Sequence, residues 1–394
     1  MLLDQHDACQ WHYVAEGNAN IVLRYTGNNP DLQGQVIRLQ KTGGLGDNMQ
    51  VAKFSVDFLS HIIAPLIGWQ YLLPMKIVQV TPMFLHLLKE RIKPERPAHR
   101  LIRDIDASSS WAFLSRDLMQ RWWPQKTLTV ELKPKWGFKP SSPFIVPEHQ
   151  ALKRTMCRFC MHSHLKGEKS MYCPLDLYSK CPTRMQRALK GLGQYPQGKL
   201  AFYLDGQSLL PENLKQGGLP GFGSWDHIME MVQKVLEKDP ILSKLKLLQQ
   251  QLDELDVEAI HDMYQQNHDG LDPFSLDAWK EVVEQFKQRT TSIQDAALTN
   301  AKQRLFEYVL SMTFKDCSIM LCVTPISHDS TSLFNASTSQ NTVIELSSKV
   351  RFAYDIRLID LDMKKMTKIP YWYALDQQIV QYILQHHLQR ECAE

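Results

Sequence analysis

The opening third of the chain mixes strand-like and helix-like hydrophobic patterns. Residues 19–27 (ANIVLRYTG) and 34–44 (GQVIRLQKTGG) are rich in β-branched residues and flank an Asn-Asn-Pro turn, which predicts a hairpin. Residues 50–68 carry apolar side chains at helical spacing, which predicts a helix that ends at Gly68. We therefore expect residues 1–115 to form a β-rich lobe that also contains helices.

The pattern changes near residue 115. Residues 127–134 (TLTVELKP) predict a strand that ends at Pro134, because proline cannot donate to a β-ladder. Helical patterns follow at residues 150–166, 181–192, 224–238, 255–266 and 284–313.

Two more strand-like runs lie near the end of the chain, at residues 317–325 and 350–363. The polar residues 327–342 between them predict a mobile loop. No internal repeat is visible. The whole pattern predicts an α+β fold, with residues 116–394 as a second lobe.

The composition is that of a globular protein, with 394 residues and 44% hydrophobic content. The 45 Lys+Arg and 42 Asp+Glu give a net charge of +3, which argues against a general nucleic-acid-binding surface. No run approaches the ~18 apolar residues of a membrane helix, and acids near the start are unlike a signal peptide. We expect a nuclear or cytoplasmic protein that binds neither nucleic acid nor membrane.

Half of the 8 cysteines lie in one short segment, which in a reducing compartment suggests a metal before disulfides. On a helix that turns ~100° per residue, Cys157, Cys160 and His164 share one stripe. Cys173 could complete a tetrahedron from the loop beyond. This Cys3His set suits structural zinc, while cysteines buried as small hydrophobic residues are the alternative.

Period-two geometry places Glu131, Lys133 and Lys135 on one face of an extended segment. Two ammonium groups spaced in this way could straddle phosphate oxygens. A solvated strand face is the alternative for such a short pattern.

The same alternation directs Asp360, Asp362 and Lys364 to one side of the last predicted strand. Carboxylates at a strand end are good magnesium ligands. Here too, a solvated edge would explain the pattern.

Asp316 lies between a helical pattern and a buried apolar run, where a carboxylate needs either a partner or a function. Together with Asp360 and bases on several separate segments, it suits metal-assisted phosphoryl transfer to a phosphorylated acceptor. These bases are Arg100, Lys133, Lys135, Lys166 and Lys364.

Two glycine turns are candidate nucleotide loops. Gly17 lies in a small-residue turn that would let backbone N–H groups approach phosphates, and an ordinary hairpin turn is the alternative. Residues 193–199 (GQYPQGK) have P-loop spacing, but Leu200 replaces the Ser or Thr that binds magnesium, which argues against a P-loop.

Several short motifs occur in a particular order: AEGNANIVL, VIRLQK, ERPAHR, ELKPKWGF, CRFCMHSHLK, YCPLDLYS, FKDCSIM, and LIDLDMK followed by YALD. In this order they resemble the motifs of the inositol-pentakisphosphate 2-kinase family, from near Ala15 to Asp376. The strings ELKPK and KDCSIM are the most specific of them.

The resemblance implies a two-lobed inositol polyphosphate kinase fold, distantly similar to protein kinases, with a nucleotide cleft between the lobes. It implies a magnesium-dependent kinase that uses ATP to phosphorylate the 2-hydroxyl of inositol 1,3,4,5,6-pentakisphosphate, giving the hexakisphosphate (phytate). Separately from the resemblance, we expect a monomer.

For ATP, the resemblance implies contacts from Gly17, Asn18, Ala19, Asn20, Arg38, Arg116, Asp117, Leu118, Glu131 and Lys133. For the acceptor, it implies Arg100, Lys135, His162, Lys166, Lys199, Asp316, Lys364 and Lys368. Asp360 would hold Mg²⁺. Asp316 would orient and deprotonate the 2-hydroxyl, and Lys133 is also assigned to catalysis. The Cys157, Cys160, His164 and Cys173 set resembles the animal and fungal zinc pattern of the family.

The chain departs from the family pattern at several positions. Gly198 and Lys199 stand where the family tends to have two asparagines that touch substrate, so that contact is either lost or replaced by one from Lys199. Trp136 stands where a cysteine is frequent. The two cysteines of the plant-type zinc site, near residues 255–285, are absent.

Two other function classes compete with a kinase. One is a catalytically weak inositol-phosphate-binding scaffold, against which the acids Asp316 and Asp360 argue, because a pure anion binder gains nothing from them. The other is a zinc-containing nucleic-acid module, against which the balanced charge argues.

Overall fold

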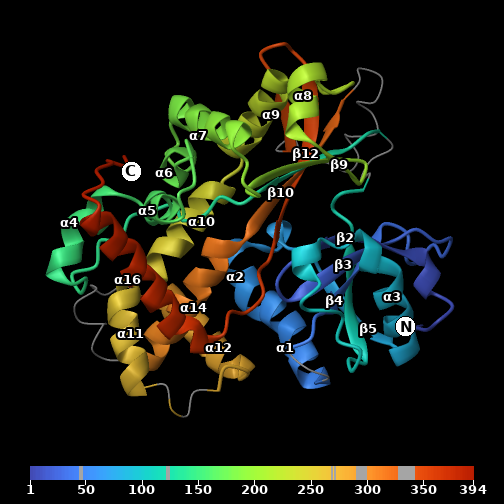
Figure 1. Cartoon of the computed structure of the whole chain (residues 1–394), viewed down its shortest axis with the longest axis horizontal. Coiled ribbons are helices and arrows are strands. Elements are labelled where there is room, and N and C mark those ends of the chain that lie inside the picture. Colours follow the sequence, from blue (N-terminus) through green and yellow to red (C-terminus); the bar gives the residue numbers. More distant parts are fainter. Residues whose placement is uncertain (44–47, 121–124, 268, 270–271, 290–299, 327–341) are drawn as a thin grey trace.

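The computed structural model describes residues 1–394 apart from residues 44–47, 121–124, 268, 270–271, 290–299 and 327–341. The predicted mobile loop at 327–342 therefore lies, except for its last residue, outside the described residues. The described chain folds into two six-stranded sheets with helices around them (Figure 1), which confirms the α+β class. None of the described helices is both long enough and apolar enough to cross a membrane.

The first sheet comes from the opening part of the chain and has the strand order β1-β5-β6-β4-β3-β2. Its strands are β1 (Leu2–Leu3), β2 (Trp11–Glu16), β3 (Asn20–Tyr25), β4 (Gln35–Gln40), β5 (Met75–Val80) and β6 (Trp111–Arg116). Strands β3 and β4 pair antiparallel, as the hairpin pattern predicts. Helix α3 (Pro82–Ile92) buries its apolar face in the core of this sheet, and Thr81 caps it by accepting from the Phe84 N–H at 3.2 Å.

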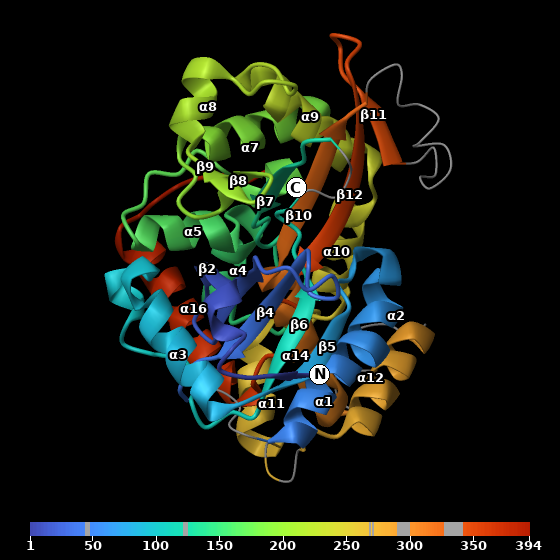
Figure 2. The same cartoon turned by 90° about the vertical axis from the view of Figure 1, so that its right-hand side faces the viewer.

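The second sheet has the order β11-β12-β10-β7-β8-β9. Its strands are β7 (Leu128–Leu132), β8 (Leu200–Leu204), β9 (Gln207–Leu209), β10 (Ser318–Pro325), β11 (Val343–Glu345) and β12 (Arg351–Ile359). Strand β10 lies between β7 and β12 and is buried along almost its whole length, which explains its continuous apolar run. Figure 2 shows that β10 and β12 extend from the second sheet toward the first.

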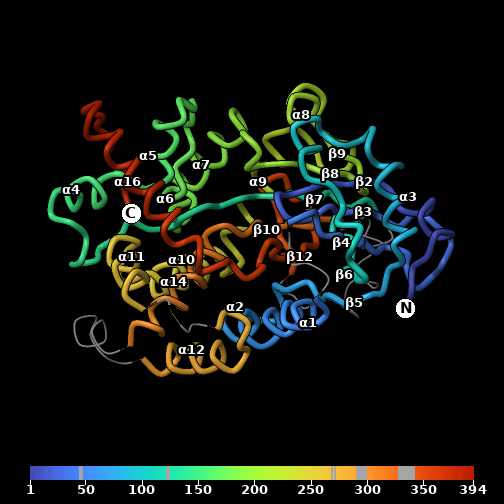
Figure 3. Tube along the Cα trace, turned by 60° about the horizontal axis from the view of Figure 1, so that its bottom comes forward, coloured from blue at the N-terminus to red at the C-terminus, as the bar shows by residue number. Residues whose placement is uncertain are grey.

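The helices pack mostly on the second sheet and on one another (Figure 3). They are α4 (Pro147–Thr155), α5 (Arg158–Leu165), α6 (Pro174–Leu177), α7 (Pro182–Gln194), α8 (Pro211–Gly217), α9 (Trp225–Lys238), α10 (Ile241–Gln251), α11 (Asp256–Asn267), α12 (Leu276–Gln288), α14 (Ala301–Asp316) and α16 (Ile369–Gln385).

The helix predicted at residues 50–68 is continuous but changes pitch. It comprises α1 (Met49–Phe58), the π-helical turn η2 (Leu59–Ile63) and α2 (Ala64–Ile67), and it ends at Gly68, whose φ of 106° favours glycine. Its apolar face belongs to the core of the second sheet, where Phe58 meets Trp279 of α12 edge to face at 5.2 Å. This early segment thus joins the part of the chain that begins near residue 115.

Two helix predictions were wrong in extent. The pattern at 150–166 is divided between α4 and α5, because Met156 and Cys157 are extended, with ψ of 131° and 150°. The pattern at 284–313 begins inside α12, which ends at Gln288. Helix α14 then carries the chain to Asp316, so this acid is the last residue of a helix.

Candidate active site

A cavity of about 350 Å³ lies between the two sheets. Its apolar wall includes Val22 and Val36 from the first sheet and Met320 and Leu358 from the second. Of the residues assigned to the nucleotide, those that line it are Gly17, Arg38, Arg116, Asp117, Leu118, Glu131, Lys133 and Asp360. Asn18, Ala19 and Asn20 continue the turn from Gly17, whose N–H donates to the Asn20 carbonyl at 2.9 Å.

The turn at Gly17 is held by the cation-rich loop at residues 94–103. Arg100 donates to Asn18 Oδ1 at 2.6 Å, and Arg103 donates to the Asn18 carbonyl at 2.9 Å. Beneath them, the buried Arg96 forms a two-pronged ion pair with Glu16 at 2.9 and 3.0 Å. Sequence reasoning missed Arg96, although the motif ERPAHR was the signal for it.

Arg38 bridges the two sheets. From β4 it donates to both oxygens of Asp362, at 2.8 and 3.2 Å, and its guanidinium lies 5.0 Å from the ring centre of Phe113. Arg38 lines the cavity as expected of a nucleotide contact, but its charge is already matched by Asp362, a carboxylate beyond the end of β12.

The segment between the sheets is fixed by Asp117, which the sequence assigned to the nucleotide, and by Arg24, which the sequence did not identify. The Asp117 carboxylate pairs with Arg24 and accepts from the Met119 N–H at 2.9 Å. Desolvation lowers the pKa of Arg116, which lines the same cavity. Asp117 therefore anchors this segment by its side chain, and Leu118 supplies apolar surface.

Three acids and one lysine gather at the second-sheet side of the cavity. Lys133 Nζ lies 3.7 Å from Glu131 Oε1, which accepts from the Ser318 hydroxyl at 3.1 Å. Asp360 directly follows β12 with a φ of 65° and faces the cavity. Desolvation by the surrounding protein raises the pKa of Asp360; Lys133 opposes this effect, and Asp362 and Glu131 add to it.

Asp316 lies at the end of α14 between two ammonium groups. Its Oδ2 is 2.9 Å from Lys364 Nζ and its Oδ1 is 3.6 Å from Lys135 Nζ, while 58% of the side chain is exposed. Desolvation by its neighbours raises the pKa of Asp316, but the attraction of Lys364, Lys135 and Lys133 outweighs this and lowers it. The site holds Asp316 as a carboxylate.

More of the residues assigned to the acceptor lie beside Lys135. Glu168 lies between two of them, 3.9 Å from Lys166 Nζ and 3.6 Å from Lys199 Nζ. Desolvation lowers the pKa of Lys199, with a further contribution from Lys135 and Lys166. Desolvation also lowers the pKa of His162 to about 4, helped by nearby cations. Glu168 was not predicted, because a lone acid in a basic segment gives no distinct signal.

Two assigned acceptor residues lie apart from this basic cluster. Arg100 is bonded to Asn18 on the first-sheet side. Lys368 ends the short 3₁₀ helix η8 (Met366–Lys368) before α16, and within the described chain no hydrogen bond or ion pair joins it to the cluster.

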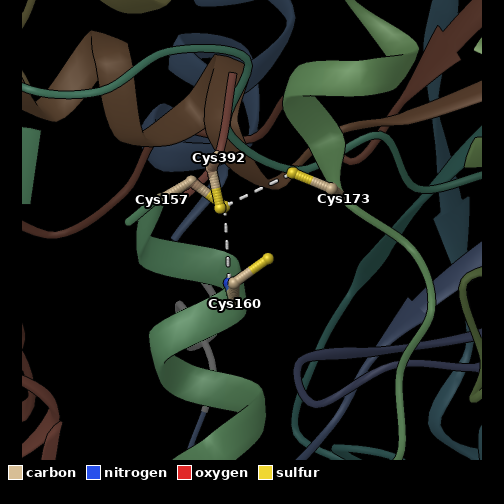
Figure 4. Close-up of side chains that lie close together, drawn as sticks. All are labelled: Cys157, Cys160, Cys173 and Cys392. Carbon is tan, nitrogen blue, oxygen red and sulfur yellow. Dashed lines mark hydrogen bonds between the residues drawn. The ribbon is translucent and has the colours of Figure 1, made fainter. Parts of the chain in front are cut away.

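Four cysteines lie close together near the starts of helices α5 and α6 (Figure 4). They are Cys157, Cys160, Cys173 and Cys392. Their sulfur atoms all lie within 4.8 Å of one another, and all four side chains are buried. Three were predicted as ligands. The fourth comes from the C-terminal segment, which is tied down where the Cys392 N–H donates to the Thr155 carbonyl at 3.0 Å.

The predicted ligand His164 is not a member of this group, which corrects the Cys3His set to four cysteines. Cys157 caps α5 from an extended conformation and does not lie on the helix, so the stripe argument does not hold. His164 lies one helical turn beyond Cys160, about 6 Å further along the axis, and Cys392 takes the remaining place.

A second group of possible metal ligands consists of acids, and a lysine already occupies its centre. Asp256, Glu258 and Asp376 surround the buried Lys153, whose Nζ lies 2.8, 2.9 and 2.7 Å from their oxygens. This ammonium occupies the place that a metal ion would need, so the group is a buried ion-pair cluster.

The chain is similar to known proteins over nearly its whole length. A family model described as inositol-pentakisphosphate 2-kinase matches residues 13–378. The chain is similar to an inositol-pentakisphosphate 2-kinase of Danio rerio, with 27% identity over 480 residues that cover 98% of this chain and 95% of the relative. The protein of the same name from Arabidopsis thaliana is 27% identical over 441 residues, with 97% and 95% covered. That of Cryptococcus neoformans is 25% identical over 413 residues, with 95% and 93% covered.

Proposed function

The chain belongs to the inositol-pentakisphosphate 2-kinase family, and from this premise we propose that it transfers the γ-phosphate of ATP to the 2-hydroxyl of inositol 1,3,4,5,6-pentakisphosphate. The product is inositol hexakisphosphate. The observation that carries the proposal beyond the family match is Asp316, a carboxylate held between Lys135 and Lys364 beside a cavity that suits a nucleotide.

ATP would bind in the cavity between the sheets. The apolar side chains of Val22, Val36 and Met320 suit a flat aromatic base, and the turn at Gly17 lies where backbone N–H groups can approach phosphates. Lys133 would contact the phosphates and neutralise the charge that develops during transfer. In this two-lobed arrangement, which we take to be distantly similar to protein kinases, residues 116–118 would serve as the hinge.

Magnesium would be held by Asp360, and the residues present fit the ion. Asp360 faces the cavity near Glu131 and Asp362; desolvation raises the pKa of Asp360, Lys133 opposes this effect, and the two neighbouring carboxylates add to it. Mg²⁺ takes one or two protein carboxylates plus phosphate oxygens. When bound, it would neutralise phosphate charge and help to align the transferring group.

The acceptor would bind at the basic cluster of Lys135, His162, Lys166, Lys199 and Lys364. Each phosphate of the acceptor carries roughly 1.5 to 2 negative charges at neutral pH, so several ammonium groups are needed to hold it. Lys199 lies within this cluster, which supports its replacing the contact of the asparagine pair. Arg100 would contact the acceptor from the side of the first sheet. Lys368 would contact it from the outer edge of the basic cluster.

Asp316 would accept the proton of the 2-hydroxyl as the phosphoryl group is transferred. Its lowered pKa keeps it ionised at neutral pH, so it can orient the hydroxyl by accepting its hydrogen bond. A weakly basic carboxylate suffices for a loose phosphoryl-transfer transition state, in which little proton transfer precedes bond cleavage.

The four-cysteine group would hold a structural zinc ion. Four thiolate ligands form a common zinc set, and the sulfur atoms of Cys157, Cys160, Cys173 and Cys392 all lie within 4.8 Å of one another. The ion would fasten the C-terminal segment to the start of α5 and α6, and therefore next to His162 and Lys166 of the acceptor cluster.

A cysteine substitution tests the zinc site. Cys392→Ser should bind zinc less tightly and unfold at a lower temperature, because zinc binding contributes directly to folding. The exposed Cys9→Ser is the matched control and should keep near-stoichiometric zinc. Elemental analysis and thermal melts of protein purified without added metal measure both effects. Wild-type protein without zinc would refute the site.

A product assay tests the function. Protein, ATP, magnesium and inositol 1,3,4,5,6-pentakisphosphate are incubated, and the products are separated by anion exchange. A hexakisphosphate peak is expected. Tight acceptor binding without a product would instead favour the catalytically weak scaffold, which the family match and the paired lysines at Asp316 do not favour.

We further propose that the protein acts as a monomer in the nucleus or cytoplasm and has no role in binding nucleic acid or membranes. The nearly balanced charge supports this view of its partners, because a net charge of +3 over 394 residues provides no general polyanion surface.

A further inference from the structure

Lys135 has an unusual backbone. Its φ of 63° lies in the left-handed region, which residues with a side chain rarely adopt. Two residues later, Gly137 packs so closely on Tyr178 that an added Cβ would lie 2.7 Å from the ring. The Lys135 ammonium, 3.6 Å from Asp316, is thus carried by a turn whose shape must be imposed by its surroundings.

The side chain that imposes this shape is Gln249 of α10, which is completely buried. Its Oε1 accepts from the Gly137 N–H at 2.8 Å, and its Nε2 donates to the Lys135 carbonyl at 3.2 Å. The amide therefore pairs with the turn on both sides of Trp136. Tyr178 supports the same point by donating its hydroxyl to the Lys135 carbonyl at 3.2 Å.

Gln249 also reaches the helix that carries Asp316. Its Nε2 donates to the Phe314 carbonyl at 3.0 Å, two residues before Asp316. Just after α10, Asp253 forms a buried ion pair with Lys315, the residue in between. One short stretch of chain thus holds both the turn that carries Lys135 and the helix end that carries Asp316.

We propose that Gln249 is a positioning residue, which fixes the distance between the Lys135 ammonium and the Asp316 carboxylate by bonding the backbones of both segments. The inference rests on the proposed function, because these two groups are taken to meet the acceptor. Removing the amide leaves buried backbone groups without this partner and frees the strained turn to relax. Small misplacements of this kind have large effects on transfer rates.

The first test compares Gln249→Met with Gln250→Met. Methionine keeps the length of glutamine but has no amide, and Gln250 is the partly exposed neighbour on the same helix, bonded to Glu394. For Gln249→Met we expect kcat/KM for the acceptor to fall roughly 10- to 100-fold, with little change in KM for ATP. The control should match the wild type. Equal increases in both KM values would overturn the inference.

A double-mutant cycle asks whether Gln249 acts through Lys135. In a Lys135→Met background, Gln249→Met should lower kcat/KM for the acceptor much less than it does in the wild type, because the side chain that Gln249 positions is already absent. If the fold-loss in kcat/KM of the double variant equals the product of the two single fold-losses, the two residues act independently and the positioning role is rejected.

If Gln249→Met does not fold, Tyr178→Phe takes its place. This change removes one donor to the Lys135 carbonyl and keeps the ring against Gly137. We expect a few-fold loss in kcat/KM for the acceptor; kinetic constants equal to those of the wild type would overturn the inference.

The wild-type assay separates this inference from the proposed function. If the wild type binds inositol pentakisphosphate but does not phosphorylate it, the function fails, and the inference is judged by the dissociation constant from calorimetry. An unchanged constant in Gln249→Met would then reject it. Absence of binding by the wild type would reject both.

Discussion

The two acids at the centre of the site, Asp316 and Asp360, have opposite electrostatic surroundings. Asp316 lies between Lys364 and Lys135, and their attraction lowers its pKa. Asp360 is desolvated and has other carboxylates nearby, and its pKa is raised. Lys133 and Lys364 act on both acids: Lys364 is the strongest attraction at Asp316, whereas Lys133 is the strongest at Asp360.

These different surroundings suit the two aspartates to two different roles. A carboxylate among lysines stays ionised without a metal and can accept a hydroxyl proton beside an anionic substrate. A carboxylate among acids is stabilised when a cation arrives, which suits a magnesium ligand. The comparison therefore predicts different responses to the same substitution.

The largest effect is expected for Asp316→Asn. It removes the proton acceptor, so kcat should fall about 10³-fold, the typical contribution of general base catalysis. Acceptor binding should persist, because the lysines remain. Steady-state kinetics and calorimetry measure the two quantities. Asp277→Asn, at a side chain that is 94% exposed, is the control. Near-normal turnover of Asp316→Asn would refute the assignment.

Asp360→Asn should have the next largest effect. Loss of a magnesium ligand should lower kcat roughly 100-fold at fixed magnesium, the scale of losing one electrostatic stabiliser. Excess magnesium should restore part of the rate, whereas it should not restore Asp316→Asn. A magnesium titration of both variants makes the comparison. An unchanged magnesium requirement in Asp360→Asn would remove this acid from the metal site.

Lys364→Met should raise KM for the acceptor about tenfold, which corresponds to the free energy of one hydrogen bond to a charged group. It should also raise the pKa of Asp316, because Lys364 provides the largest attraction that lowers it. The acid limb of the kcat profile should therefore move to higher pH. The exposed Lys365→Met is the control. An acid limb at the wild-type position would show that Asp316 does not titrate in turnover.

The smallest effect is a pH dependence of magnesium activation in the wild type. Because the pKa of Asp360 is raised, protons compete with the cation there at a higher pH than at an ordinary carboxyl. The apparent magnesium affinity should fall as the pH is lowered toward the raised pKa of Asp360. In Asp360→Asn this dependence should be weaker. The same slope in both proteins would place the titrating group elsewhere.

Local sequence predicted much of the fold. The hairpin of β3 and β4, the end of a helix at Gly68 and the strand β10 follow from turn residues and hydrophobic period. The break between α4 and α5 was missed, since nothing in the pattern at residues 156 and 157 interrupts the helical period. That error in turn produced the assignment of His164 as a ligand.

The residues assigned to the site by motif are carried by segments far apart in the chain, and sequence named many of them because each motif has its own local signature. Partners without such a signature were missed. Glu168 is one acid among bases, and Cys392 is a single cysteine near the end of the chain. Arg96 was missed for another reason: it lies inside the motif ERPAHR but is one of several arginines in its loop.

The sequence by itself determined which groups are available and where strands and helices form, because these depend on neighbouring residues along the chain. Tertiary structure alone decided the partners: Cys392 in place of His164, Lys153 inside its ring of acids, and Gln249 between the segments of Lys135 and Asp316. Such contacts form when the packing of distant helices buries polar groups, and buried polar groups must then find partners in space.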